Sequence, residues 1–336
     1  MGEGNSLIMT LLVHEKVLGT LPTKPLQIKP KGIDMKIVMT LGGNALLERG
    51  EVMSAENQAR NIAKAVEAIK AVAQSHDLIL SHGNGPQVGL IALQNLAYDK
   101  TPPYPLDVLG AQSQAMVGYL FMQALQNALP DKTVVNLVTR TLVDEKDPAF
   151  LNPTKFIGPV YDEATAHRLA EEHRWTVKPD GAHWRRVVPS PKPVRILESD
   201  TIRTLSESGV MVIAAGGGGV PVIHTKDGFI GQEAVIDKDF AGSMLAQTLE
   251  ADLFVIATDV DGVIDGWGTP DVALITKATV GEMRQMAFPA GSMGPKVDAA
   301  CAFVQATGRP AVIGPLKNIL GMVEGTAGTR IVSGFG

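Results

Sequence analysis

Cysteine is nearly absent from this sequence, since Cys301 is the only one among 336 residues. A single cysteine excludes an internal disulfide and is typical of proteins that work in a reducing compartment. Because Cys301 lies in the apolar helical stretch of residues 297–303, we interpret it as a small buried residue rather than a nucleophile. The seven histidines form no HxxxH or Cys/His pattern, so the sequence predicts no structural zinc site.

Long apolar runs and a strong net charge are also missing. The most apolar segment, residues 209–223, is short and is interrupted by four consecutive glycines and by Pro221, so it falls below the roughly twenty apolar residues of a membrane span. A net charge of −5 provides no basic face for nucleic acid or a membrane surface. We therefore expect a cytoplasmic globular protein whose partners are small molecules, with neither nucleic acid nor membrane among them.

Two widespread nucleotide-binding fingerprints are missing as well. The sequence has no GxxxxGK[ST] motif, and it has no GxGxxG motif between a strand and a helix. The first absence excludes a Walker-type loop, and the second argues against a dinucleotide-dependent oxidoreductase.

Instead, the chain has four glycine-rich loops at the ends of expected strands or at the start of a helix. Glycine lets backbone N–H groups approach an oxyanion closely, and a helix N-terminus behind the loop adds partial positive charge. The repetition predicts that several phosphate-like groups are bound together. We interpret His82, inside the second loop, as a residue that packs against or orients that loop rather than a catalytic base. The loops are residues 42–45 (GGNA), 82–86 (HGNGP), 216–221 (GGGGVP) and 291–296 (GSMGPK).

The chain divides into a leader, a regular body and a proline-rich insert. Residues 1–34 carry prolines before the first strand pattern, and we expect an extension outside the fold. Between residues 144 and 195, seven prolines exclude long regular helices while two tryptophans argue against disorder, so we expect a small inserted subdomain. The expected strands are residues 35–41, 77–81, 133–138, 210–215, 253–258 and 310–313; the expected helices are residues 54–74, 105–129, 199–208, 239–250 and 295–307, with another from Pro86.

The alternation of short apolar strands with helices predicts an α/β fold with a mainly parallel sheet and helices on both faces. In such sheets, ligands bind at the carboxyl ends of the strands, where the glycine loops fall. Lys238 and Lys296 stand at expected helix N-termini, which favour anions over cations, so these lysines either serve an anionic ligand or point into water. Asp239 is either an N-cap or a contact to a nucleotide or its metal. The loop at residues 258–271 either closes over a base or ribose or consists of two ordinary turns.

Six motifs, in this order, resemble those of the carbamate kinases, a branch of the amino acid kinase family. They are residues 41–45 (LGGNA), 81–89 (SHGNGPQVG), 152–155 (NPTK), 216–221 (GGGGVP), 233–239 (EAVIDKD) and 291–296 (GSMGPK). The resemblance covers residues 35 to about 332. It implies an open three-layer αβα sandwich and a homodimer, with residues 35–143 as a carbamate-binding part, 144–195 as a protruding lid and 196–336 as a nucleotide-binding part.

The resemblance also implies roles for individual residues. Lys155, Lys238 and Lys296 match catalytic positions, with Lys155 reaching the anion from the lid. Trp267 stands in a stretch where carbamate kinases often have a tyrosine, so this chain departs from the family's pattern at the implied adenine contact. Mg²⁺ is expected to be held mainly by the phosphates of ATP or ADP, with no protein ligand set. The implied substrate-binding residues are Gly42, Gly43, Asn44, Gly83, Asn84, Gly217 and Gly218, and the implied nucleotide-binding residues are Lys238, Asp239, Asp259, Trp267 and Lys296.

The implied reaction is ATP + carbamate ⇌ ADP + carbamoyl phosphate, by direct in-line transfer without a phosphoenzyme. Carbamate is already an anion and needs no general base, which fits a site of lysines and backbone N–H groups. Arginine or ureide catabolism would supply carbamoyl phosphate. Three alternatives stay open. Another small-molecule kinase of the family should lack the lid lysine, and a non-catalytic nucleotide sensor should lack one or more of the three lysines. A dinucleotide-dependent oxidoreductase is the weakest of the three, because its fingerprint is missing.

Overall fold

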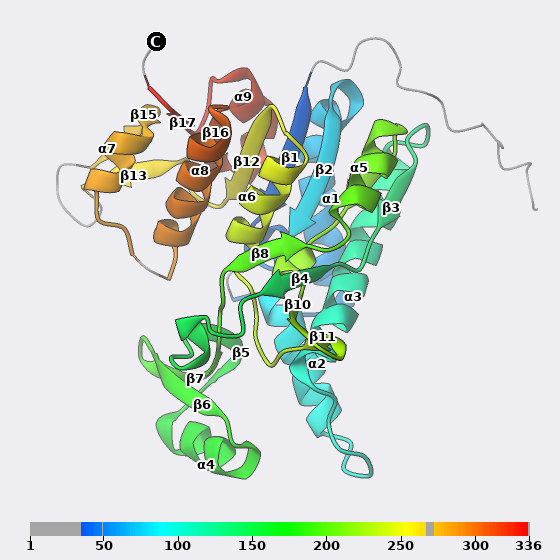
Figure 1. The fold of residues 1–336 in the computed structure, drawn as a ribbon, viewed down its shortest axis with the longest axis vertical. Helices are drawn as coiled ribbons and strands as arrows, with labels where there is room; N and C mark the ends of the chain where they lie inside the picture. The colour runs from blue at the N-terminus through cyan, green and yellow to red at the C-terminus, as the bar shows by residue number, and fades with distance from the viewer. Residues whose placement is uncertain (1–34, 49, 267–271, 290, 335–336) are drawn as a thin grey trace, which may run out of the picture.

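The computed structural model describes residues 35–48, 50–266, 272–289 and 291–334. Its centre is an eight-stranded sheet in the order β15-β17-β16-β12-β1-β2-β9-β3, in which every neighbouring pair is parallel except β16 and β17 (Figure 1). The predicted α/β fold with a mainly parallel sheet is therefore confirmed. The strands are β1 (Lys36–Leu41), β2 (Asp77–His82), β3 (Val134–Asn136), β9 (Met211–Ile213), β12 (Leu253–Thr258), β15 (Lys277–Thr279), β16 (Ala311–Pro315) and β17 (Thr329–Val332).

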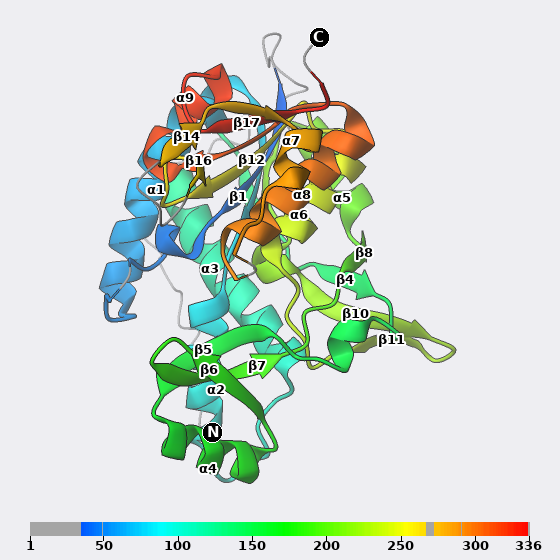
Figure 2. The same cartoon turned by 90° about the vertical axis from the view of Figure 1, so that its left-hand side faces the viewer.

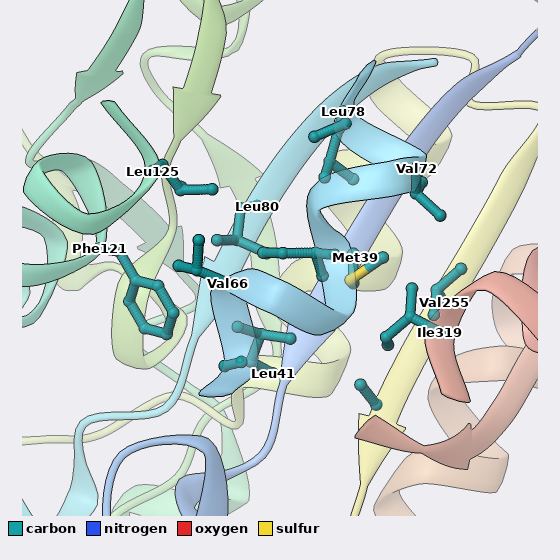
Figure 3. Packing of buried hydrophobic residues seen from close by; sticks show 14 of the residues in the cluster. Met39, Leu41, Val66, Val72, Leu78, Leu80, Phe121, Leu125, Val255 and Ile319 are labelled. Carbon is teal, nitrogen blue, oxygen red and sulfur yellow. The ribbon is translucent and has the colours of Figure 1, made fainter. Parts of the chain in front are cut away.

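Helices cover both faces of this sheet, because successive residues of each buried strand point to opposite sides. Met39 and Leu41 pack with residues of α1, α3 and α9 (Figure 3), whereas Val38 packs with residues of α5, α6 and α8 on the other face. The helices are α1 (Ala55–Ser75), α2 (Gly85–Leu96), α3 (Leu106–Ala128), α5 (Ser199–Glu207), α6 (Lys238–Thr248), α7 (Val280–Gln285), α8 (Met293–Thr307) and α9 (Ile319–Glu324). Among the described residues, no helix is both long and apolar enough to cross a bilayer.

Local sequence signals place these helices well. Ser54 caps α1, as predicted, by accepting a hydrogen bond from the Asn57 amide at 3.2 Å. The other body helices and strands that were predicted begin and end within a few residues of the expected positions, whereas α7, α9, β15 and β17 were not predicted. Strong apolar periodicity and glycine breaks were sufficient to locate them.

A second, four-stranded sheet and a protruding subdomain lie below the main sheet in Figures 1 and 2. The second sheet has the order β11-β10-β4-β8, and β4 and β8 pair antiparallel on either side of the proline-rich insert. The protruding subdomain is a three-stranded antiparallel sheet with one helix. The bounds are β4 (Arg140–Val143), β8 (Pro193–Ile196), β10 (Val220–Thr225) and β11 (Gly228–Gly231), then β5 (Lys155–Tyr161), α4 (Glu163–His173), β6 (Thr176–Asp180) and β7 (His183–Val188); the hairpin of β13 (Val263–Asp265) and β14 (Ala273–Ile275) completes the sheets.

The insert is more regular than its proline content predicts. α4 has eleven residues and lies in the interval between Pro159 and Pro179, which contains no proline. Asp162 caps it by accepting from the Thr165 amide at 2.9 Å. The prolines were expected to exclude long regular helices, and α4 is a helix of only average length; it fits between two prolines because proline breaks a helix only locally.

Candidate active site

Two of the predicted glycine loops meet at the carboxyl ends of β1 and β2. The Gly42 amide donates to the Ala257 carbonyl at 3.0 Å, and the Gly83 amide donates to the Leu41 carbonyl at 3.1 Å. A Cβ on Gly83 would lie 3.7 Å from the Gly43 nitrogen and 3.5 Å from Cδ of Lys238. The two loops and the Lys238 side chain therefore form one continuous surface.

The third glycine loop packs against the second. Gly217 and Gly218 have φ angles of +61° and +92°, which favour glycine. A Cβ on Gly217 would collide with the side chain of Asn84, and one on Gly218 would lie 2.6 Å from the Ile236 carbonyl oxygen. Asn84 is held from its other side, where its Nδ2 donates to Ser113 Oγ at 2.7 Å. The structure thus brings together the backbone of the predicted substrate-binding residues, including Asn44 in the short 3-10 turn Gly43–Ala45.

Asp239 lies at the centre of the site and binds both predicted lysines. Lys238 Nζ donates to its Oδ1 at 2.5 Å, and Lys296 Nζ donates to its Oδ2 at 2.9 Å. Thr40, on the α6 side of β1, donates its hydroxyl to Oδ1 at 3.0 Å. Asp239 is only 3% exposed. Asp237, not Asp239, is the N-cap of α6, because its Oδ1 accepts from the Asp239 amide at 2.9 Å.

Burial and charge act against each other in this cluster. Burial lowers the pKa of Lys238, and the nearby Asp239 carboxylate offsets this only in part. Burial also acts to lower the pKa of Lys296, but the attraction of Asp239 outweighs it and raises that pKa overall. Burial alone would raise the pKa of Asp239, whereas Lys238 and then Lys296 hold it well below its usual range. The carboxylate is therefore charged and keeps two ammonium groups side by side.

The third predicted lysine reaches the same place from the protruding subdomain. Lys155 is the first residue of β5, and its Nζ donates to Asp237 Oδ2 at 2.6 Å. Because Asp237 and Asp239 are two residues apart at the start of α6, Lys155 and the two buried lysines contact the same end of this helix. The sequence motifs alone did not identify Asp237 as this partner.

Two adjoining cavities open at the carboxyl ends of β1, β12 and β16. The smaller, of about 720 Å³, is lined in part by Gly42, Gly43 and Lys238. The larger, of about 1040 Å³, combines several large apolar side chains with polar ones in its wall. Thr258, Asp259 and Lys296 line both, so Lys296 stands where the cavities join. The apolar lining of the larger cavity includes Val260, Ile264, Met286, Phe288 and Met293.

Sequence reasoning missed most of this apolar wall. Met286 and Phe288 lie five and three residues before the GSMGPK loop, and that position was the only signal that could have identified them. Asp259 lines both cavities, and its carboxylate accepts from the Thr258 hydroxyl at 3.1 Å. Trp267, the other predicted contact on this side, lies outside the described residues.

His82 is buried and structural, in agreement with its interpretation from the sequence. Its Nδ1 lies 2.9 Å from the Gly83 carbonyl oxygen, and its ring stacks on Phe121 with centroids 6.0 Å apart. Gly216 lies so close that a Cβ there would collide with the ring. Burial lowers the pKa of His82 to about 4, so the ring is neutral at physiological pH.

The single cysteine is not among the residues that line the two cavities. Cys301 is buried in α8, and burial raises the pKa of its thiol to about 11, which leaves the thiol protonated. Within the described part of the chain, no cluster of three or more histidine, cysteine, aspartate or glutamate residues could hold a metal ion.

Known proteins are similar to this chain in sequence and fold over about nine tenths of its length. The model of the amino acid kinase family matches residues 35–315. A carbamate kinase of Rhizobium meliloti is 50% identical over 90% of this chain and 94% of its own length, and one of Escherichia coli K12 is 51% identical over 88% and 98%. The solved structure of carbamate kinase from Giardia lamblia bound to AMP-PNP is 40% identical, covers 89% of this chain and 98% of its own, and superimposes with a TM-score of 0.82. By family match, identity and fold, this chain belongs to the carbamate kinase branch of the amino acid kinase family.

Proposed function

We propose that this chain is a carbamate kinase and catalyses ATP + carbamate ⇌ ADP + carbamoyl phosphate. The observation that carries the proposal is the pair Lys238 and Lys296 on the buried Asp239, next to the glycine loops and where the two cavities join. The high identity to carbamate kinases over about nine tenths of the chain supports this activity within the family.

The two cavities fit the two halves of a nucleotide. We assign the larger cavity to the adenine and ribose, because its wall includes the large apolar side chains of Met286 and Phe288 against which a flat heterocycle can pack, whereas several lysines line the smaller cavity and suit phosphates. The phosphates then extend past Asp259 to Lys296 and Lys238. The loops that carry Gly42, Gly43, Asn44, Gly83, Asn84, Gly217 and Gly218 would hold the carbamate and the transferred phosphoryl group. The amides of Gly42, Gly83 and Gly218 already donate to main-chain carbonyls, so these three glycines would contribute the close approach that a residue without a Cβ allows rather than a hydrogen bond.

The residues suit direct phosphoryl transfer. The attacking carbamate oxygen is already negative, so no general base is required, and the buried His82 is not needed as one. The difficulty of the reaction is to bring two anions together, and fixed cations in a poorly hydrated site reduce that repulsion. Mg²⁺, bound mainly by the nucleotide phosphates, would neutralise further charge, which is consistent with an Asp239 whose oxygens are already occupied by ammonium groups.

Assembly, location and pathway follow from the resemblance alone. We infer a cytoplasmic homodimer that handles carbamoyl phosphate from arginine or ureide catabolism. Light scattering of the purified protein tests the dimer, and a monomeric mass at assay concentration would contradict it.

A coupled assay tests the activity. Purified protein, Mg²⁺, ADP and carbamoyl phosphate should produce ATP, detected continuously, with acetyl phosphate as an acyl phosphate that lacks the amino group. If ADP binds but neither acyl phosphate yields ATP, the nucleotide sensor becomes the better interpretation. ATP turnover that requires a different acceptor would instead indicate another small-molecule kinase of the family.

A further inference from the structure

We propose that Asp237 is a positioning residue that orients Lys155 toward the transferred phosphoryl group; the inference rests on the proposed function. Asp237 uses its two carboxylate oxygens for two separate tasks. Oδ1 accepts from the Asp239 amide at 2.9 Å and so caps α6, and Oδ2 accepts from Lys155 Nζ at 2.6 Å. One side chain thus joins the lysine of the protruding subdomain to the helix that carries Lys238.

The contact determines where the remaining donors of Lys155 lie. A lysine ammonium has three N–H donors. Asp237 accepts one of them, so the others are held beside the start of α6 instead of sweeping through solvent on a long, flexible side chain. This restraint is needed here more than at the buried pair, because the Lys155 side chain is 35% exposed and those of Lys238 and Lys296 are 13% and 17% exposed.

The same short segment of the body holds the subdomain at other points. Glu233 forms an ion pair with Arg186 of β7 at 3.6 Å, and its other oxygen accepts from the Leu106 amide at 2.7 Å. The Val235 amide donates to the Pro189 carbonyl at 3.0 Å. Residues 233–237 therefore form a strip along which the subdomain rests, and the contact of Asp237 is the one next to the lysine cluster.

Asp237→Asn separates the two tasks. An amide side chain has one acceptor oxygen, and asparagine is as good an N-cap as aspartate, so the cap can be kept while the charged partner of Lys155 is lost. Asp162→Asn is the matched control, because Asp162 caps α4 in the same subdomain by accepting from the Thr165 amide.

We expect Asp237→Asn to lower kcat/KM for carbamoyl phosphate by roughly tenfold, the typical worth of a hydrogen bond to a charged group. The Kd for ADP, measured by calorimetry without the second substrate, should stay within about threefold. Asp162→Asn should match the wild type in both. In a Lys155→Ala background, Asp237→Asn should have no further effect on kcat/KM, because the side chain that it positions is gone.

The outcomes separate this inference from the proposed function. If the wild type makes no ATP from carbamoyl phosphate, the proposed function is wrong, and this result is independent of how the variants behave. If the wild type is active and Asp237→Asn is equally active, the positioning role is wrong. An equal loss with and without Lys155, accompanied by a lower melting temperature, would show that Asp237 acts only as a helix cap.

Discussion

The buried lysine pair and the subdomain lysine use the same device at different depths. In the body, the nearly inaccessible Asp239 holds the ammonium groups of Lys238 and Lys296. At the edge, Asp237 holds the ammonium group of Lys155, and this ion pair is more exposed to solvent. Charges interact more strongly where water is excluded, and the surrounding main chain is fixed by the sheet. The buried cluster is thus preorganised, while the position of Lys155 depends on how the subdomain rests on the body.

The first and largest prediction concerns the buried cluster. Lys296→Met should lower kcat by roughly 10²-fold or more, because the lost cation stabilises charge that develops in the transition state. The exposed Lys100→Met is the matched control and should retain wild-type turnover. Steady-state kinetics with a melting curve checks both. A folded Lys296→Met protein with a normal kcat would show that Lys296 takes no part in the mechanism. The buried cluster would then have no larger effect on kcat than the exposed Lys155.

The second prediction uses the histidines of the two regions. His82, buried in the body, has a pKa of about 4 against an unperturbed 6.5, so the unfolded chain binds the proton first as the pH falls. Above pH 6.5, His82 is neutral in both states and does not lower the free energy of unfolding. Between pH 6.5 and pH 4, protonation of His82 in the unfolded chain should lower the free energy of unfolding by about 3 kcal/mol.

Denaturant unfolding of the wild type at several pH values, beside imidazole NMR, measures this decline. His167→Gln, which alters a half-exposed histidine of the protruding subdomain, should leave the pH profile unchanged. A His82 resonance that titrates near pH 6.5 in the folded protein would contradict the assignment.

The third prediction tests the exposed side of the comparison. Lys155→Ala should lower kcat/KM for carbamoyl phosphate by roughly tenfold, less than the loss at Lys296, because a more exposed charge is better screened. The Kd for ADP should stay within about threefold. If ADP binding collapses while the KM for carbamoyl phosphate is unchanged, the subdomain belongs to the nucleotide end and the two ends of the site must be exchanged.

The smallest expected effect concerns residues 1–34, which lie outside the described residues and before the family match at residue 35. A chain that begins at Met35 should keep kcat within about twofold of the full chain, since the catalytic contacts named above all lie beyond that point. Kinetics and melting curves of the two chains provide the check. A large loss of activity or stability would mean that the fold extends before Met35.

Local signals were sufficient to predict six of the eight strands of the central sheet, the six helices α1, α2, α3, α5, α6 and α8, and the chemical type of the site. The short helices α7 and α9, the strands β15 and β17, and the elements of the second sheet and of the protruding subdomain were not predicted. Ser54 marks the start of α1, alternating strands and helices indicate a parallel sheet, and glycine at strand ends indicates anion-binding loops. Each of these signals is carried by residues that are close in the sequence, and the covalent chain limits how such residues can be arranged relative to one another. For the same reason, Lys238 and Lys296 could be recognised as cations at helix starts, where a cation is out of place without a ligand or partner.

Only the tertiary structure decided which groups share a partner. Asp239 serves Lys296, 57 residues away, and Thr40, 199 residues away, and Asp237 serves Lys155, 82 residues away. The apolar wall around Met286 also exists only where separate segments meet. Such contacts depend on how the layers pack, because a side chain finds its partner through the position of its element in the fold and not through its distance along the chain.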